Sequence, residues 1–207
     1  MTSRLAVVAF AISSLAAAPL PFSHRLHLRL KLECATCHAS VTTSAKLEDN
    51  NLPSKQACVR CHNEKMVRIE SPARTMLVRF GHARHLKLGN AAPVIAAAID
   101  RKTYLSPPDD IRRHLDTSNP CVACHRGLDE SDAVNRANLP QMADCLVCHS
   151  KIDPPFSCEL CHDPDQTLRP ASHTPDYIDQ HSSGKIKLDK PSCAVCHGRR
   201  FRCQGCH

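Results

Sequence analysis

The sequence predicts a mostly irregular fold with short α-helices and few short strands. One pattern, Cys-x-x-Cys-His, occurs seven times along 207 residues and favours a short helical turn at each place. Fifteen prolines interrupt longer runs of regular structure. Large aromatic side chains are scarce, with no Trp, two Tyr and five Phe, so side chains alone leave a chain of this length without an adequate core. The core must therefore contain something besides protein.

The seven motifs account for all fourteen cysteines of the chain. This spacing is the attachment signature of c-type haem, because two thiols on one edge of a helical turn can add to the two vinyl groups of one porphyrin. The histidine that follows binds the iron as its proximal ligand. We therefore expect seven covalently bound haem c groups and a haem-cored multihaem cytochrome c. The attachment cysteines are Cys34, Cys37, Cys58, Cys61, Cys121, Cys124, Cys145, Cys148, Cys158, Cys161, Cys193, Cys196, Cys203 and Cys206, and the proximal ligands are His38, His62, His125, His149, His162, His197 and His207.

Other interpretations of the cysteines explain less. A structural zinc site usually combines Cys-x-x-Cys with a second, distant ligand pair. Disulfides would suit an exported chain, but they give no reason for a histidine after every second cysteine. A thioredoxin-like Cys-x-x-Cys occurs once in a chain, not seven times. Haem attachment is the interpretation that accounts for every position of the motif.

Residues 1–18 are expected to form a secretory signal peptide. Arg4 supplies a short basic region, and the 14-residue apolar stretch that follows is too short to span a membrane. Small residues favour cleavage after Ala16, and an uncleaved anchor is the alternative. Haem is attached to bacterial c-type cytochromes outside the cytoplasmic membrane, which agrees with export. We expect a periplasmic or extracellular protein.

The positive charge of the polypeptide does not indicate nucleic-acid binding. The formal net charge is +7 at pH 7. Each haem carries two propionates and adds about −1 when ferric and about −2 when ferrous, so seven haems bring the mature protein to about −1 oxidised and about −8 reduced. The excess of Lys and Arg is best explained by propionate partners, with a surface for other polyanions as the alternative.

Seven histidines lie outside the motifs, one for each expected iron. A single histidine is often an ordinary surface or core residue, but the equal numbers favour ligation of each iron by two histidines. Methionine competes poorly as a distal ligand, because only three methionines lie beyond the predicted signal peptide. The expected distal ligands are His24, His27, His82, His85, His114, His173 and His181.

The chain contains an internal duplication. Phe-x-His-x-x-His-Leu begins at Phe22 and again at Phe80, and Asn-Leu-Pro begins at Asn51 and again at Asn138. In both copies Asn-Leu-Pro begins seven residues before a motif cysteine, and the two flanking motifs begin 24 residues apart. We therefore expect two homologous units.

These repeats divide the chain behind the signal peptide into three parts. Residues 19–70 form a two-haem unit, residues 71–165 a three-haem unit with an inserted helical segment, and residues 166–207 a C-terminal two-haem unit. Each part has as many free histidines as motifs. Most distal ligands are therefore expected to come from the same part as the motif, although ligands could cross between parts.

The repeated segments resemble the class III multihaem cytochromes c, the trihaem and tetrahaem carriers of anaerobic bacteria. In that family the two histidines of Phe-x-His-x-x-His ligate two different haems. The resemblance implies that His24 and His82 ligate the first haem of their units, and that His27 and His85 ligate another. It covers the two repeated units but neither the insertion nor the C-terminal part.

Three local elements are predicted besides a short helix at each motif. Residues 26–33 alternate apolar and polar side chains, which predicts a short strand whose i and i+3 side chains point to opposite faces. Residues 93–104 are the best candidate for a longer helix, and residues 109–115 for a short one that carries His114.

Two imidazoles on each iron leave no position for a substrate, and the lack of methionine ligands favours low reduction potentials. We expect an electron carrier in respiratory electron transport, not an enzyme. The alternatives are a protomer of an extracellular cytochrome filament and an electron-transfer subunit of a multihaem oxyanion reductase, which would need an iron with one open face. The expected partners are other cytochromes, a quinol-oxidising complex or a terminal reductase, with membrane contact only through a partner. A homo-oligomer or filament is the alternative assembly.

Overall fold

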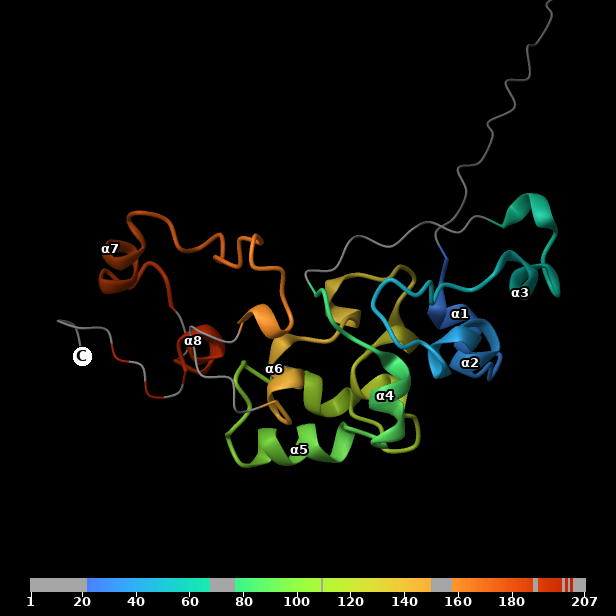
Figure 1. Ribbon diagram of the computed structural model, residues 1–207, viewed down its shortest axis with the longest axis horizontal. Helices are drawn as coiled ribbons and strands as arrows, with labels where there is room; N and C mark the ends of the chain where they lie inside the picture. Colours follow the sequence, from blue (N-terminus) through green and yellow to red (C-terminus); the bar gives the residue numbers. More distant parts are fainter. Residues whose placement is uncertain are drawn as a thin grey trace, which may run out of the picture.

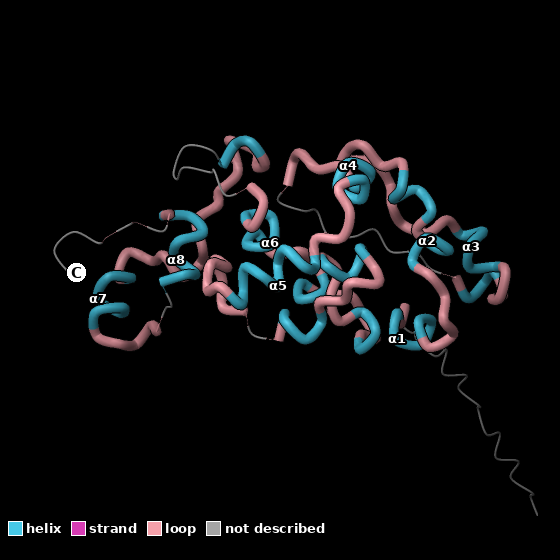
Figure 2. The backbone as a smooth tube through the Cα atoms, turned by 90° about the horizontal axis from the view of Figure 1, so that it is seen from below, coloured by secondary structure: helices cyan, strands magenta, loops and turns pink. Residues whose placement is uncertain are grey.

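The computed structural model describes residues 22–67, 77–108, 110–149, 158–187, 190–198, 200 and 202 (Figure 1). The predicted signal peptide and the seventh motif, residues 203–207, lie outside the described residues. The described part is built from short helices joined by turns and loops (Figure 2), with one isolated β-bridge between Leu77 and His162. The predicted fold class is confirmed. Within the described residues, no helix has the length and apolar character needed to cross a membrane.

Short helices and 3-10 turns alternate along the chain. The α-helices are α1 (His24–Leu28), α2 (Cys34–Cys37), α3 (Lys55–Val59), α4 (His82–Lys87), α5 (Ala92–Asp100), α6 (Met142–Leu146), α7 (Tyr177–Ser182) and α8 (Lys190–His197). The 3-10 turns are η1 (Ala39–Thr42), η2 (Glu64–Met66), η3 (Ile111–His114), η4 (Pro120–Ala123), η5 (Leu128–Glu130), η6 (Arg136–Asn138) and η7 (Cys158–Leu160).

The inserted segment of the second unit forms the only conventional apolar cluster in the described part. Helix α5 begins with a proline in its first turn, where the missing N–H costs no hydrogen bond. Its Ile95 is fully buried and packs with Tyr104, Ile111 and Ala143. The prediction of a longer helix over residues 93–104 is confirmed in α5, which begins one residue earlier and ends at Asp100. The short helix predicted over residues 109–115 appears as the 3-10 turn η3.

The prediction of a strand over residues 26–33 is wrong. Residues 24–28 form α1, and a turn follows it. The hydroxyl of Ser23 accepts a hydrogen bond from the Leu26 N–H at 3.2 Å and caps the helix, which satisfies a backbone donor locally. A strand would need a neighbouring strand for its donors, and the described residues supply none there.

The two repeated units dock on each other reciprocally. The Arg25 N–H in α1 donates to the Ser131 carbonyl of the second unit at 3.0 Å, and the Ala83 N–H in α4 donates to the Ser44 carbonyl of the first unit at 2.9 Å. Ser44 and Ser131 occupy equivalent places, ten residues after the first cysteine of their units. Helix α1 packs against η5, and α4 packs against η1. Each histidine helix therefore belongs to one unit and rests on the other, as an approximate twofold axis requires.

Two contacts reinforce this docking. The Asp132 carboxylate accepts a hydrogen bond from the Ser23 hydroxyl at 2.7 Å and forms an ion pair with Arg25 at 2.5 Å. In the reciprocal contact the backbone at Gly81 approaches so closely that a Cβ atom there would lie 2.5 Å from the Ala45 carbonyl oxygen. Only glycine fits at that position without a shift of the backbone.

Candidate haem-binding site

The structure brings five of the predicted distal histidines close to motif histidines. In every pair the ring centres lie 5.9–6.4 Å apart. The pairs are His24 with His38, His27 with His62, His82 with His125, His85 with His149, and His173 with His197.

This separation is too large for direct ring stacking but suits one metal ion between two imidazoles. With a metal–nitrogen distance of about 2 Å and a ring centre about 1.1 Å beyond the nitrogen, two axial imidazoles have centres about 6.2 Å apart. All five separations agree with that value within about 0.3 Å. The residues present therefore fit an iron with two histidine ligands at each of the five places.

The ring planes fall into two classes that repeat between the units. The pairs of the first motif in each unit are nearly parallel, at 9° for His24 and His38 and at 19° for His82 and His125. The pairs of the second motif are crossed, at 53° in the first unit and 52° in the second. The pair in the C-terminal part is parallel, at 8°. The duplication therefore extends from the sequence to the orientation of the candidate ligands.

Hydrogen bonds to backbone carbonyls orient the first motif histidine of each repeated unit. Nδ1 of His38 lies 2.7 Å from the Asn51 carbonyl oxygen, and Nδ1 of His125 lies 3.2 Å from that of Asn138. Because a carbonyl can only accept, Nδ1 carries the proton and Nε2 keeps its lone pair for a metal. Asn51 and Asn138 begin the repeated Asn-Leu-Pro segments. The sequence revealed this repeat, but its role in orienting the motif histidines was missed.

The helices α1 and α4 orient one distal histidine each by the same principle. Nδ1 of His27 lies 2.7 Å from the Ser23 carbonyl oxygen, and Nδ1 of His85 lies 2.9 Å from that of Gly81. Both acceptors lie four residues earlier, so one helical turn fixes the ring and again leaves Nε2 as the metal-binding nitrogen.

Aromatic rings fix the same histidines from the side. Phe22 stacks on His27 with ring centres 4.4 Å apart and meets His24 edge-on at 4.9 Å. Phe80 repeats both contacts, at 4.4 Å with His85 and at 4.8 Å with His82. The phenylalanine of Phe-x-His-x-x-His therefore packs against both candidate ligands of its helix. A matching role of Tyr177, which stacks on His173 at 4.7 Å, was missed in the sequence because no second copy marks it.

Electrostatics favour the form of histidine that binds a metal. Burial, and next the neighbouring His38, lower the pKa of His24. Burial lowers the pKa of His125, and burial followed by His125 lowers the pKa of His82. A lowered pKa keeps the imidazole neutral, and only the neutral ring has a lone pair for iron.

The described motifs form short helical turns, as predicted. In the first five motifs the histidine N–H donates to the carbonyl of the first cysteine at 2.9–3.0 Å. This closes one turn and puts both sulfur atoms on one edge. The twelve described motif cysteines are all unbridged. Within the same residues, no group of three or more His, Cys, Asp or Glu side chains gathers as it would around a zinc ion.

One continuous cavity of about 4270 Å³ runs between these turns. Its lining includes all but one of the described motif cysteines and all seven predicted distal histidines. Exposed leucines such as Leu88 and Leu139 are among its lining residues. The protein therefore has the hollow interior that a core of porphyrins requires, in place of a packed interior of side chains.

The remaining candidate ligands are placed differently. His114 lies beside Gly127, and its Nε2 is 3.1 Å from Nε of Arg113; among the described residues it does not stack on a motif histidine. His162 forms the backbone bridge with Leu77. His181 lies 6.1 Å from Tyr177 between ring centres. The expected partner of His181 in the seventh motif, together with Cys203 and Cys206, lies outside the described residues.

Comparison with known proteins identifies a family. The family model described as outer membrane cytochrome MtrC/MtrF-like, domains II/IV, matches residues 31–207. Neither the curated proteins nor the solved structures contain a match to the chain.

Proposed function

The chain belongs to the outer membrane cytochrome MtrC/MtrF-like family, domains II/IV, and we propose that it is an exported seven-haem electron carrier in which every iron has two histidine ligands. Membership of the family makes it a multihaem cytochrome of electron transfer. The number of haems, the ligands and the route are the proposal.

The observation that carries this proposal is the set of five histidine pairs. Each pair joins a motif histidine to a histidine outside the motifs, at a separation that suits one iron. A random placement of histidines would not repeat the same separation and ring angle in two units. We assign the paired histidines as axial ligands, with His114 and His181 as the distal ligands of the fifth and seventh haems.

The proposed carrier uses the chemistry that haem supplies when bound, the exchange of one electron between ferric and ferrous iron. In each of the four pairs that include a histidine of α1 or α4, a backbone carbonyl holds one imidazole, and a phenylalanine ring contacts the distal one. Ligands held in this way would change little when the charge on the iron changes. With both axial positions taken, no substrate can bind the iron. This favours electron transfer over oxyanion reduction.

The neighbourhood of the motifs suggests the order of the electron route. His24 and His27, on one helix, join the first haem to the second, and the Asn119 amide contacts the Cys34 sulfur at 3.6 Å, which joins the first motif to the third. Burial, and next Asp144, raise the pKa of Cys145 to about 11. The thiols of Cys124 in the third motif and Cys161 in the fifth lie near enough to add smaller contributions. Burial, followed by Cys158 of the fifth motif, likewise raises the pKa of Cys196 in the sixth. We therefore propose the order second, first, third, fourth, fifth, sixth.

The remaining parts of the proposal concern the class of ligand arrangement, the place of action and the partners. Helices α1 and α4 each carry two histidines that lie near two different motif histidines. This supports a ligand arrangement like that of class III cytochromes. The family description supports a location outside the cytoplasmic membrane, at or beyond the outer membrane, after removal of a signal peptide. Other redox proteins would then deliver and accept the electrons.

The spin state of the irons tests the proposal. The oxidised protein should be low-spin throughout, the reduced protein should bind carbon monoxide poorly, and turnover of nitrite, hydroxylamine or sulfite should be negligible beside electron exchange with another cytochrome. A high-spin signal equal to one haem per chain, with substrate-dependent reoxidation at an enzymatic rate, would favour the reductase instead.

A further inference from the structure

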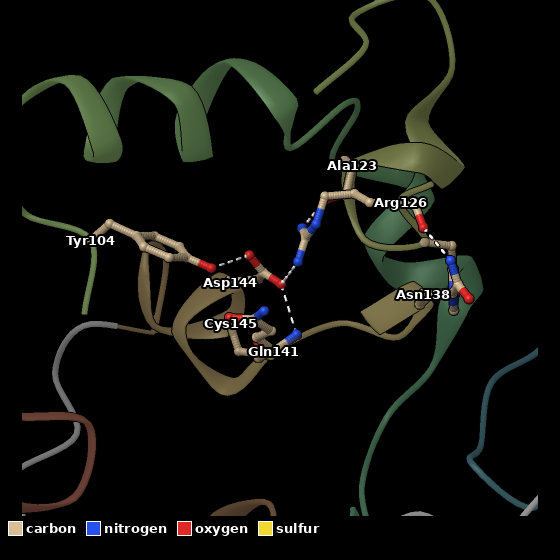
Figure 3. Close-up of polar contacts among 8 residues, drawn as sticks. Tyr104, Ala123, Arg126, Asn138, Gln141, Asp144 and Cys145 are labelled. Atoms are coloured by element: carbon tan, nitrogen blue, oxygen red, sulfur yellow. Dashed lines mark hydrogen bonds and ion pairs between the residues drawn. The ribbon is translucent and has the colours of Figure 1, made fainter. Parts of the chain in front are cut away.

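The second unit contains a buried charged cluster that the candidate ligands do not explain (Figure 3). Arg126 and Asp144, each with a side chain only 3% exposed, form an ion pair at 2.7 Å. The Tyr104 hydroxyl donates to the other carboxylate oxygen of Asp144 at 2.7 Å. Figure 3 shows Asp144 held between the tyrosine and the guanidinium. Such a cluster needs a reason, because desolvation of a buried ion pair offsets much of its Coulomb attraction.

The two charges belong to two different haem motifs. Arg126 directly follows the motif histidine His125, and its guanidinium donates to the Ala123 carbonyl inside the third motif at 2.7 Å. Asp144 directly precedes Cys145 of the fourth motif, and its carboxylate accepts from the Gln141 N–H at the start of α6 at 2.7 Å. By sequence, the cation of the ion pair therefore belongs to the third motif and its anion to the fourth.

The first unit shows that the local fold forms without these charges. At the same distances from its first cysteine it has Ala39 and Ala57 in place of Arg126 and Asp144. Helix α3 of the first unit nevertheless has the same length and the same place relative to the motif as α6. Tyr104 comes from the segment inserted only in the second unit. The cluster therefore distinguishes the two units and is not needed to build either turn.

We propose that the buried charges of Arg126 and Asp144 shift the reduction potentials of the neighbouring haems. Arg126 raises the potential of the third haem, and Asp144 lowers that of the fourth. A nearby cation stabilises the reduced haem and a nearby anion destabilises it, and burial keeps both fields from being screened by water and salt. Tyr104 and the Gln141 N–H hold the carboxylate in place. This inference rests on the proposed function, and it makes the third haem, at the junction between the two units, a preferred site for electrons.

The test gives the second unit the two alanines that the first unit has at the equivalent positions. In the double variant Arg126→Ala and Asp144→Ala, the potential of the third haem should fall, that of the fourth should rise, and the gap between them should narrow. Potentials of individual haems are followed by NMR of the haem methyl groups during stepwise reduction. The matched control is Lys55→Ala with Glu64→Ala, which removes an ion pair beside the second motif whose side chains are 47% and 71% exposed. The control should leave all gaps unchanged.

A second variant tests the inference if the double variant fails to fold. Tyr104→Phe keeps both charges but removes the hydrogen bond that disperses the negative charge of Asp144, so it should lower the potential of the fourth haem and widen the gap. An unchanged gap in both variants, or loss of haem from the double variant with an unchanged gap in Tyr104→Phe, would overturn the inference. Intact mass and spin state of the wild-type protein test the proposed function separately, because they do not depend on the gap.

Discussion

Replacement of His24 by alanine should turn one specific haem high-spin without detaching it. The ring centres of His24 and His38 lie 6.3 Å apart, and their planes differ by 9°. His24 belongs to α1, which packs against the second unit. The substitution removes one axial imidazole but neither attachment cysteine. With seven haems, the high-spin fraction should be about one seventh of the iron, and about two sevenths when His82→Ala is added.

Electron paramagnetic resonance of the oxidised protein measures this fraction, and intact mass checks that all haems remain attached. Phe22→Leu is the matched control, since it removes the ring that packs against His24 and His27 but leaves both imidazoles. It should remain low-spin. If both His24→Ala and His82→Ala keep a fully low-spin spectrum, the assignment of distal ligands from α1 and α4 is wrong.

Three further predictions address ligand orientation and the docking of the units. The oxidised wild-type protein should show two classes of low-spin signal, because parallel and crossed imidazole planes split the iron orbitals differently; a single class would contradict the ring angles. Gly81→Ala should destabilise the protein by about 1–3 kcal/mol, measured by thermal unfolding, because its Cβ meets the Ala45 carbonyl oxygen at 2.5 Å; an unchanged unfolding temperature would refute this close approach. Hydrogen bonds from Ser23 and Arg25 lower the pKa of Asp132, so its contribution to stability should be present at neutral pH and lost as pH falls through the lowered value; Asp132→Asn should remove that part of the acid dependence.

The sequence was sufficient to predict the cofactor chemistry because covalent attachment of haem requires particular residues close together in the sequence. Two cysteines and a histidine on one turn are needed whatever surrounds them, and the described motifs do form such turns. The inserted helix was equally predictable, since its apolar run and the proline in its first turn are local signals.

Contacts between residues far apart in the chain could not be predicted from the sequence. The alternation over residues 26–33 indicated a strand, but a serine cap and a surface on the other unit made it a helix. The resemblance suggested that one segment could serve two haems, which remains a prediction, and the extended geometry proposed for that segment was wrong. The reciprocal docking depends on Ser44 and Ser131 carbonyls, and any residue type supplies a carbonyl. The buried pair of Arg126 and Asp144 likewise lacked a signal, because charged residues beside a motif are usually solvated.

The intact mass of the purified protein is the most direct test of haem attachment at the seven motifs. We expect a mass equal to the processed polypeptide plus seven haem groups, which survives denaturation because thioether bonds hold the haems. A mass that corresponds to fewer than six haems, or to intact disulfides in place of haem, would contradict the assignment of the cysteines and with it the electron-transfer function proposed for the chain.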